Sequence, residues 1–141
     1  MTEPEITVDG SAEENGLANM VAELLRANVE SSAYKKRVFS RMNGSVALSA
    51  TDAEVSLTLV FDRGRCVVRD GVLPGTGSGV TADSDSILEL SNVRIVGGLP
   101  HLFDRAGRAV ASKVLHGTIR IRGLLRHPVT LTRLAFVLSV N

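Results

Sequence analysis

The chain has 141 residues, of which 44% are hydrophobic and only 4% aromatic, and its formal charge at pH 7 is +1. This length suits one domain, and a chain of this size buries enough surface to build a core without covalent staples. One cysteine excludes an intrachain disulfide and a thiolate cluster for a structural metal, so we expect a reducing, cytoplasmic setting. The apolar runs are shorter than the ~20 residues of a membrane span, and the acidic start lacks the features of a signal peptide.

Charge is unevenly distributed along the chain. Acidic residues precede the first basic residue, Arg26, and no acidic residue follows Asp104. Such asymmetry is typical of contact with an anionic partner, and equally of complementarity between two ends of one fold. Residues 1–15 combine acids, Gly and Pro with little periodic apolar content, which predicts a disordered acidic tail before a single domain over 16–141.

Two helices are expected first. Apolar residues recur at the i, i+3, i+4, i+7 spacing over about 16–29, with Asn15 available as the cap. A shorter helix follows, capped by Ser31 or Ser32 and ended by the turn pair at 43–44.

The period then changes to two, which predicts strands. Alternation over 46–48 and 55–61 indicates two strands with one buried face, and the Asp-Arg-Gly at 62–64 predicts a hairpin into a third strand over 65–70. The "GTGSG" stretch that follows is expected to be a flexible connection and not a phosphate loop, because it lacks the Lys-Ser/Thr ending and leads into a short strand at 80–82.

The next segments are helical in pattern but interrupted. Asp83 or Ser84 can cap a helix directly after the strand. The apolar stretch 93–103 contains two glycines and a proline, so we expect a loop or a frayed helix end there. A further amphipathic helix is expected from Leu102 to a stop at Gly117.

The last part of the chain begins with "HGTIRIRGLLRHP" at 116–128. Its alternation predicts a strand with Ile119 and Ile121 on one face and the arginines at 120 and 122 facing water. Pro128 suits the first turn of a final helix. The inner stripe of that helix is expected to comprise Leu131, Leu134, Ala135 and Leu138, with Phe136 and Val137 off it. The order of elements, about five strands with grouped helices, predicts an α+β fold.

Catalytic and metal-binding groups are sparse. The three histidines lack metal-ligand spacing, Asp83 and Asp85 fit capping better than acid–base work, and Cys66 lies mid-strand as a small core residue. The alternating arginines lack aromatic stacking partners, so nucleic-acid binding is not expected. We therefore expect no enzyme, no cofactor and no metal site. What is unusual is the aliphatic surplus in 93–103 and the final helix, which would suit a hollow core or groove, or else a packed core or dimer interface.

Three stretches together resemble the SCP-2 sterol-transfer family, the sterol carrier protein-2-like or non-specific lipid-transfer proteins. They are "VSLTLVFDRGRCVVRDG", "VTADSDSILEL" and "HGTIRIRGLLRHPVTLTRLAFVLSV", and the resemblance covers about residues 17–140. It implies a five-stranded mixed sheet with helices packed on one face and a hydrophobic tunnel between the layers. It also implies binding or transfer of a fatty acid, fatty acyl-CoA, phospholipid or sterol without a covalent step. The chain ends in "LSVN" and not in a peroxisomal signal, which favours a bacterial cytoplasmic protein.

Carried over position by position, the resemblance implies a set of lipid-binding residues in three groups. The tunnel candidates are Leu57, Leu59, Phe61, Ile87, Leu88, Leu90, Leu131, Leu134, Phe136 and Leu138. The mouth candidates are Ile95, Leu99, Leu102 and Phe103, and apolar positions of the neighbouring helix and strand add Val110, Val114, Ile119 and Ile121. Arg105, Arg108 or Arg126 would hold an anionic headgroup or contact an anionic membrane surface.

Two other functions remain open at this stage. One is an interaction or accessory domain that has a closed core and binds a partner protein or a second copy as a homodimer. The other is a small enzyme acting on a hydrophobic substrate, which would need a polar pair deep in a pocket.

Overall fold

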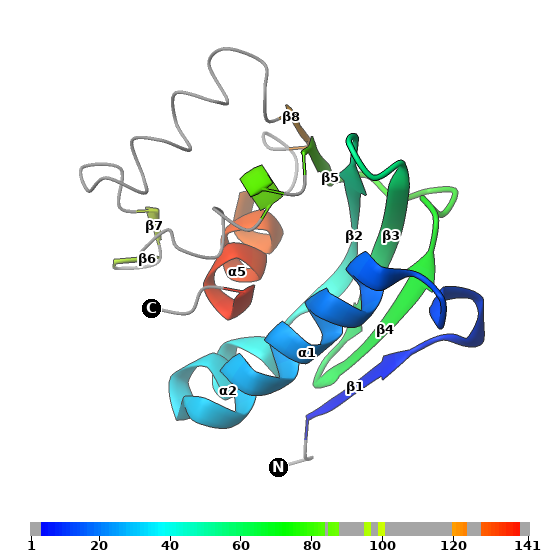
Figure 1. The fold of residues 1–141 in the computed structure, drawn as a ribbon. Coiled ribbons are helices and arrows are strands. Elements are labelled where there is room, and N and C mark those ends of the chain that lie inside the picture. Colours follow the sequence, from blue (N-terminus) through cyan, green and yellow to red (C-terminus); the bar gives the residue numbers. More distant parts are fainter. Residues whose placement is uncertain are drawn as a thin grey trace.

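The computed structural model describes residues 4–83, 85–87, 95–96, 99–100, 120–123 and 128–138. Its main body is one sheet with α1, α2 and α5 packed on the same face (Figure 1). The elements in chain order are β1 (Glu5–Val8), the 3-10 turn η1 (Gly10–Ala12), α1 (Gly16–Ser31), α2 (Ala33–Phe39), β2 (Asn43–Ala50), β3 (Val55–Asp62), β4 (Arg65–Asp70), β5 (Gly79–Ala82), β6 (Ile95–Val96), β7 (Leu99–Pro100), β8 (Arg120–Arg122) and α5 (Pro128–Leu138).

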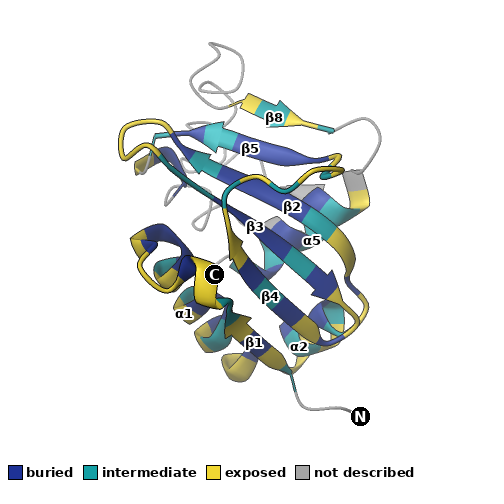
Figure 2. Cartoon of the chain, turned by 90° about the vertical axis from the view of Figure 1, so that its right-hand side faces the viewer, coloured by how far each residue is buried: buried dark blue, intermediate teal, exposed yellow. Residues whose placement is uncertain are grey.

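The sheet is mixed and has the strand order β1-β4-β3-β2-β5-β8. β1 runs parallel to β4 and β2 parallel to β5, whereas the β2–β3, β3–β4 and β5–β8 pairs are antiparallel. Figure 2 looks onto the face that the helices leave uncovered. The predicted α+β class, with a mixed sheet and helices on one face, is confirmed; the sheet has six strands where about five were expected.

β1 is the strand of the six-stranded sheet that the sequence pattern did not indicate. Residues 1–15 were expected to be a disordered tail, but residues 5–8 pair with residues 65–68 of β4, and Ile6 is buried. The Arg26 guanidinium, on α1, donates two hydrogen bonds of 3.2 and 2.8 Å to the carbonyl oxygen of Ile6. Two apolar residues, Ile6 and Val8, are too few to predict a strand in a segment rich in acidic residues. Backbone hydrogen bonds to β4 and the burial of Ile6 nevertheless hold the segment in the sheet.

α1 begins at the predicted cap. The Asn15 side-chain oxygen accepts a 3.1 Å hydrogen bond from Ala18 N, and its Nδ2 donates to Ser56 O at 2.9 Å and to Asp70 Oδ1 at 2.8 Å. One side chain thus caps the helix and fixes it to β3 and β4. Ser32 caps α2 by accepting from Lys35 N at 3.2 Å.

The predicted β3–β4 hairpin is confirmed, with positive φ at Gly64 as expected and also at Arg63. A second, two-residue hairpin forms where a loop or frayed helix end was expected, because β6 pairs with β7 in antiparallel register. The sequence between them is Gly-Gly, a pair typical of tight hairpins. The expectation of a loop or frayed helix end was therefore wrong for residues 95–96 and 99–100, and the rest of 93–103 lies outside the described residues.

The glycine-rich connection after β4 is anchored to the sheet. Residues 71–78, which we name the crossing loop, pass over the helix-free face (Figure 2). Thr58, on that face, donates from Oγ1 to Gly71 O at 2.7 Å and accepts from Leu73 N at 3.1 Å. At the other end, Ser78 Oγ donates to Ser45 O at 3.1 Å. β5 follows it, as predicted.

Candidate functional site

The helix-facing side of the sheet is a continuous aliphatic surface. Since residues paired across strands share a face, Leu48 lies beside Leu57 and Val80, and Leu59 lies beside Val46 and Val68. The buried residues on this face are Val46, Leu48, Ala50, Leu57, Leu59, Phe61, Cys66, Val68, Val80 and Ala82. This surface faces α1, α2 and α5 and is one wall of the candidate ligand layer.

The alternation predicted for β8 is confirmed. Ile121 pairs with Val80 on the helix-facing side and is partly buried against the core, while Arg120 and Arg122 are exposed on the opposite face. The basic half of the "TIRIR" motif therefore lies outside the ligand layer.

The predicted tunnel residues on β3 lie in a close-packed part of the core. Leu57 and Leu59 have no exposed surface, and the ring of Phe61 meets that of Phe39 edge to face, with centroids 6.0 Å apart and planes at 77°. Such packing is typical of a filled interior. In this conformation these three side chains are part of the filled core.

α5 covers the sheet with a stripe that differs slightly from the predicted one. Leu131 and Leu134 are buried, as expected, but Val137 is fully buried and Leu138 only partly. A helix with 3.6 residues per turn can turn either residue inward after Leu134. Asn28 of α1 decides between them, because its Nδ2 donates a 3.0 Å hydrogen bond to Val137 O in the buried contact between the helices.

Phe136 joins α5 to α2. Its ring contacts Tyr34 edge to face at 5.2 Å, and the Lys35 Nζ lies 5.7 Å from the ring centroid. Burial lowers the pKa of the Lys35 ammonium. Lys35 is the one buried charged side chain in the part of the chain that the structure describes. A cation against an aromatic face partly offsets the cost of leaving water.

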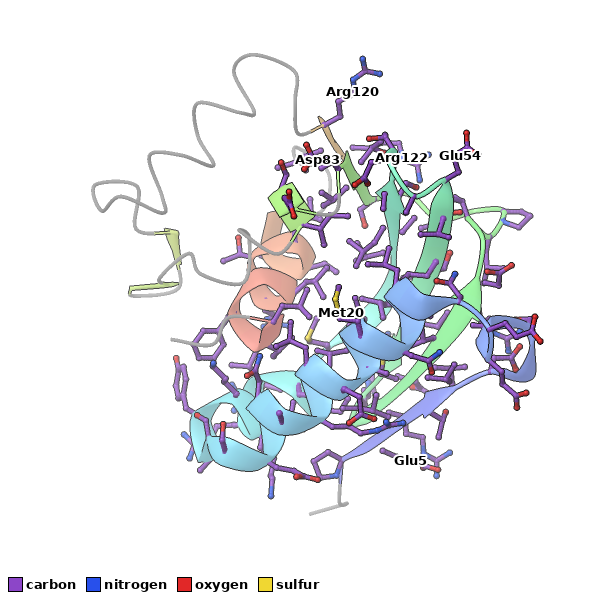
Figure 3. The ribbon with its side chains drawn as sticks, in the orientation of Figure 1. Glu5, Met20, Glu54, Asp83, Arg120 and Arg122 are labelled. Carbon is purple, nitrogen blue, oxygen red and sulfur yellow. The ribbon has the colours of Figure 1, made fainter. Side chains whose placement is uncertain are left out.

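Among the described residues, seven apolar side chains pack against the core while keeping some exposed surface: Val8, Met20, Val38, Val55, Ile121, Phe136 and Leu138. We name the four on α1, β8 and α5 the boundary residues: Met20, Ile121, Phe136 and Leu138. Met20 extends from α1 toward the side of α5 (Figure 3). Unlike the β3 side chains, these residues offer apolar surface to a ligand without unpacking the core. Sequence reasoning missed Met20 as a site residue, although its helical spacing with Leu17 and Val21 marked it as inward-facing.

Cys66 and Asp83, two groups that could serve in catalysis, have structural roles here. Burial raises the pKa of the Cys66 thiol to about 12, so it is a poor nucleophile. Asp83 Oδ1 accepts a 2.7 Å hydrogen bond from Ser86 N, the predicted cap of the helical turn at 85–87. Across the described ranges, His, Cys, Asp and Glu form no group of three or more able to hold a metal ion.

Several predicted site residues lie outside the described residues: Leu88, Leu90, Leu102, Phe103, Val110, Val114, Ile119, Arg105, Arg108 and Arg126. The predicted helix from Leu102 lies there too. Ile95 and Leu99 are placed only as backbone, in β6 and β7. Ile87 is buried in the core cluster. No helix within the described ranges is long and apolar enough to cross a membrane.

Comparison with known proteins identifies the fold. No family model and no curated protein sequence matches this chain. Among solved structures, one described as "UbiJ-SCP2 Ubiquinone synthesis protein" is similar with a TM-score of 0.58 and 16% identity, over 86% of this chain and 94% of that one. "Crystal structure of sterol carrier protein 2" is similar with a TM-score of 0.51 and 15% identity, over 86% and 95% of the two chains.

The protein therefore has an SCP-2-like fold, and the resemblance in the sequence motifs is confirmed at the level of fold. At these identities the likeness extends to the arrangement of sheet and helices.

Proposed function

We propose that this protein binds a hydrophobic small molecule, such as a lipid, between the sheet and α1, α2 and α5, without a covalent step. The observation that carries the proposal is the SCP-2-like fold with boundary residues that leave apolar surface accessible at the edge of its core. The proposal includes a non-enzymatic, cytoplasmic role.

The energetics suit such a ligand. Burying about ten methylene groups contributes roughly 8 kcal/mol before the costs of association, so an acyl or isoprenoid chain needs few polar contacts. Among the described side chains, the layer offers methyl, methylene and aromatic groups with Lys35 at one end. The proposal also includes an entrance for the ligand, formed by Leu102, Phe103 and the other predicted mouth residues. Arg105, Arg108 or Arg126 would contact an anionic headgroup or membrane surface there.

The ligand classes to test are fatty acids and isoprenoid quinones. Fatty acids follow from the motif resemblance. Quinones follow from the description of one structural neighbour as a ubiquinone synthesis protein. Both present a long apolar chain with a small polar end, which is what the layer can accommodate.

The proposal is tested by extracting purified protein with organic solvent, identifying released lipids by mass spectrometry, and titrating a fluorescent fatty acid. We expect co-purified lipid and saturable binding that Phe136→Ala weakens. Val129→Ala is the matched control, because Val129 lies on the same helix but is 57% exposed. Absence of both lipid and saturable binding would contradict the proposal. A stable dimer without lipid uptake would favour the interaction-domain alternative instead.

A further inference from the structure

We propose a second site, for a small carboxylate, on the face of the sheet opposite the helices. It is formed by Arg122 of β8, the crossing loop and the hydroxyls of Ser49 and Thr81. The sheet separates it from the apolar layer, so it does not depend on the proposed lipid-binding function.

A pocket exists at this place. Its volume is about 120 Å³, and it is lined by Ala47, Ser49, Val72, Gly79, Val80, Thr81 and Arg122. The crossing loop supplies one wall through Val72, and its ends are fixed to the sheet through Thr58 and Ser78. The wall is therefore held in place by hydrogen bonds on both sides of the pocket.

The floor of the pocket is open because residue 79 is glycine. A Cβ at this position would lie 3.2 Å from Ala47 O and 3.5 Å from the Arg122 Nη2. Gly79 does not have a positive φ, so no backbone conformation requires a glycine here. What the missing side chain provides is room beside the guanidinium.

The guanidinium of Arg122 is held in a fixed position, and no described carboxylate neutralises its charge. Arg122 Nη2 donates a 3.0 Å hydrogen bond to Thr76 O of the crossing loop, which fixes the side chain across the face. The salt bridges among the described residues are Arg26–Glu23 and Arg65–Glu5, and neither involves Arg122. A guanidinium has five N–H donors and pairs best with a planar carboxylate.

Size and charge narrow the class of ligand. A single guanidinium matches a monoanion, the hydroxyls of Ser49 and Thr81 can donate to its oxygens, and Ala47 and Val72 offer methyl groups to a short chain. The volume is below the ~150 Å³ of a cavity that accepts benzene, so the chain is short, about two to four carbons. The carboxylate comes either from a free short-chain acid or from a glutamate side chain.

The test is an NMR titration of the isotope-labelled protein with propionate, with its uncharged analogue propionamide at matched ionic strength, and with N-acetylglutamate amide. We expect saturable shifts of the Ala47, Gly79 and Thr81 amides with the carboxylates and none with propionamide. Whichever of the two carboxylates binds more tightly shows whether the ligand is a free short-chain acid or a glutamate side chain. Arg122→Gln should weaken binding about tenfold or more. Arg120→Gln is the matched control, since Arg120 lies on the same strand and face but does not line the pocket, and its side chain extends outward from the end of β8 (Figure 3).

Gly79→Ala is the second variant, and it keeps Arg122 while filling the floor. It should also weaken propionate binding. If Arg122→Gln does not fold, the Gly79→Ala result alone tests the proposed site. Absence of saturable shifts, equal shifts with propionamide, or unchanged binding in both variants would overturn the proposal.

Discussion

Asn28 of α1 donates a 3.0 Å hydrogen bond from Nδ2 to the carbonyl oxygen of Val137 in α5, across 109 positions of sequence. Both residues are buried. This bond fixes the rotation of α5 on the layer, and with it the residues that face the core.

Replacing Asn28 by Ala should lower the free energy of unfolding by about 1–3 kcal/mol, because a buried carbonyl loses its donor. Urea denaturation measures the change. Glu30→Ala, at an exposed position of the same helix, is the control and should have little effect. Equal stability of the two variants would show that the bond does not hold α5.

Asn15→Asp tests the contact between the start of α1 and β4. Aspartate still caps the helix, but its carboxylate would replace an amide that now donates to Asp70 Oδ1 at 2.8 Å. Two carboxylates would repel each other in the folded state but lie apart in the unfolded chain, so the substitution costs stability wherever both are charged. We expect the loss relative to Asn15→Ala to be present at pH 7 and to shrink as pH falls through the carboxylate range. A loss independent of pH would exclude this electrostatic cause.

The buried thiol of Cys66 should make the stability of the protein depend on pH in the alkaline range. Its thiol has a pKa of about 12 in the folded protein against an ordinary value of 9.0. Above pH 9 the unfolded chain releases this proton while the folded chain keeps it, so stability falls by up to about 1.4 kcal/mol per pH unit between these values. Cys66→Ala should lack this part of the alkaline decline in denaturation midpoints. Identical alkaline profiles for the two proteins would refute it.

Gly123→Ala tests how the crossing loop is seated. A Cβ at residue 123 would lie 2.4 Å from Gly77 O, and Gly123 has a positive φ of 79°. Gly71→Ala is the matched control, because it has a similar φ of 73° but nothing within 4 Å of the added atom. The control should lose about 1–2 kcal/mol from the backbone alone, and Gly123→Ala clearly more. Equal thermal shifts for the two variants would mean that the contact with the loop is not close.

Much of this fold could be predicted from periodicity. The spacing of apolar residues marked α1, and the alternation of Ile121 with two arginines marked the faces of β8, because burial of one face leaves a direct pattern in sequence. β1 left only two apolar residues, and its partner strand lies some 60 positions away, a pairing that no local pattern encodes. The inward turn of Val137 depends on Asn28, a tertiary contact.

The candidate site was predictable in kind but not in detail. The apolar character of β3 and α5 was evident from the sequence. The periodicity does not reveal which neighbour packs on each side chain, such as Phe39 on Phe61, and the lipid-binding role of the β3 residues stays a prediction. Met20 and the anchoring of the crossing loop by Thr58 depend on neighbours brought together only by folding.

The central claim is that an apolar ligand enters the layer between sheet and helices, and Ile121 and Arg120 allow the most direct measurement. They are adjacent on β8 but lie on opposite faces of the sheet. Titration of a fluorescent fatty acid into Ile121→Gln and Arg120→Gln, each confirmed as folded by circular dichroism, compares the two faces. We predict that Ile121→Gln weakens binding about tenfold or more and that Arg120→Gln leaves it unchanged. Unchanged binding in Ile121→Gln, or equal loss in both variants, would contradict the account.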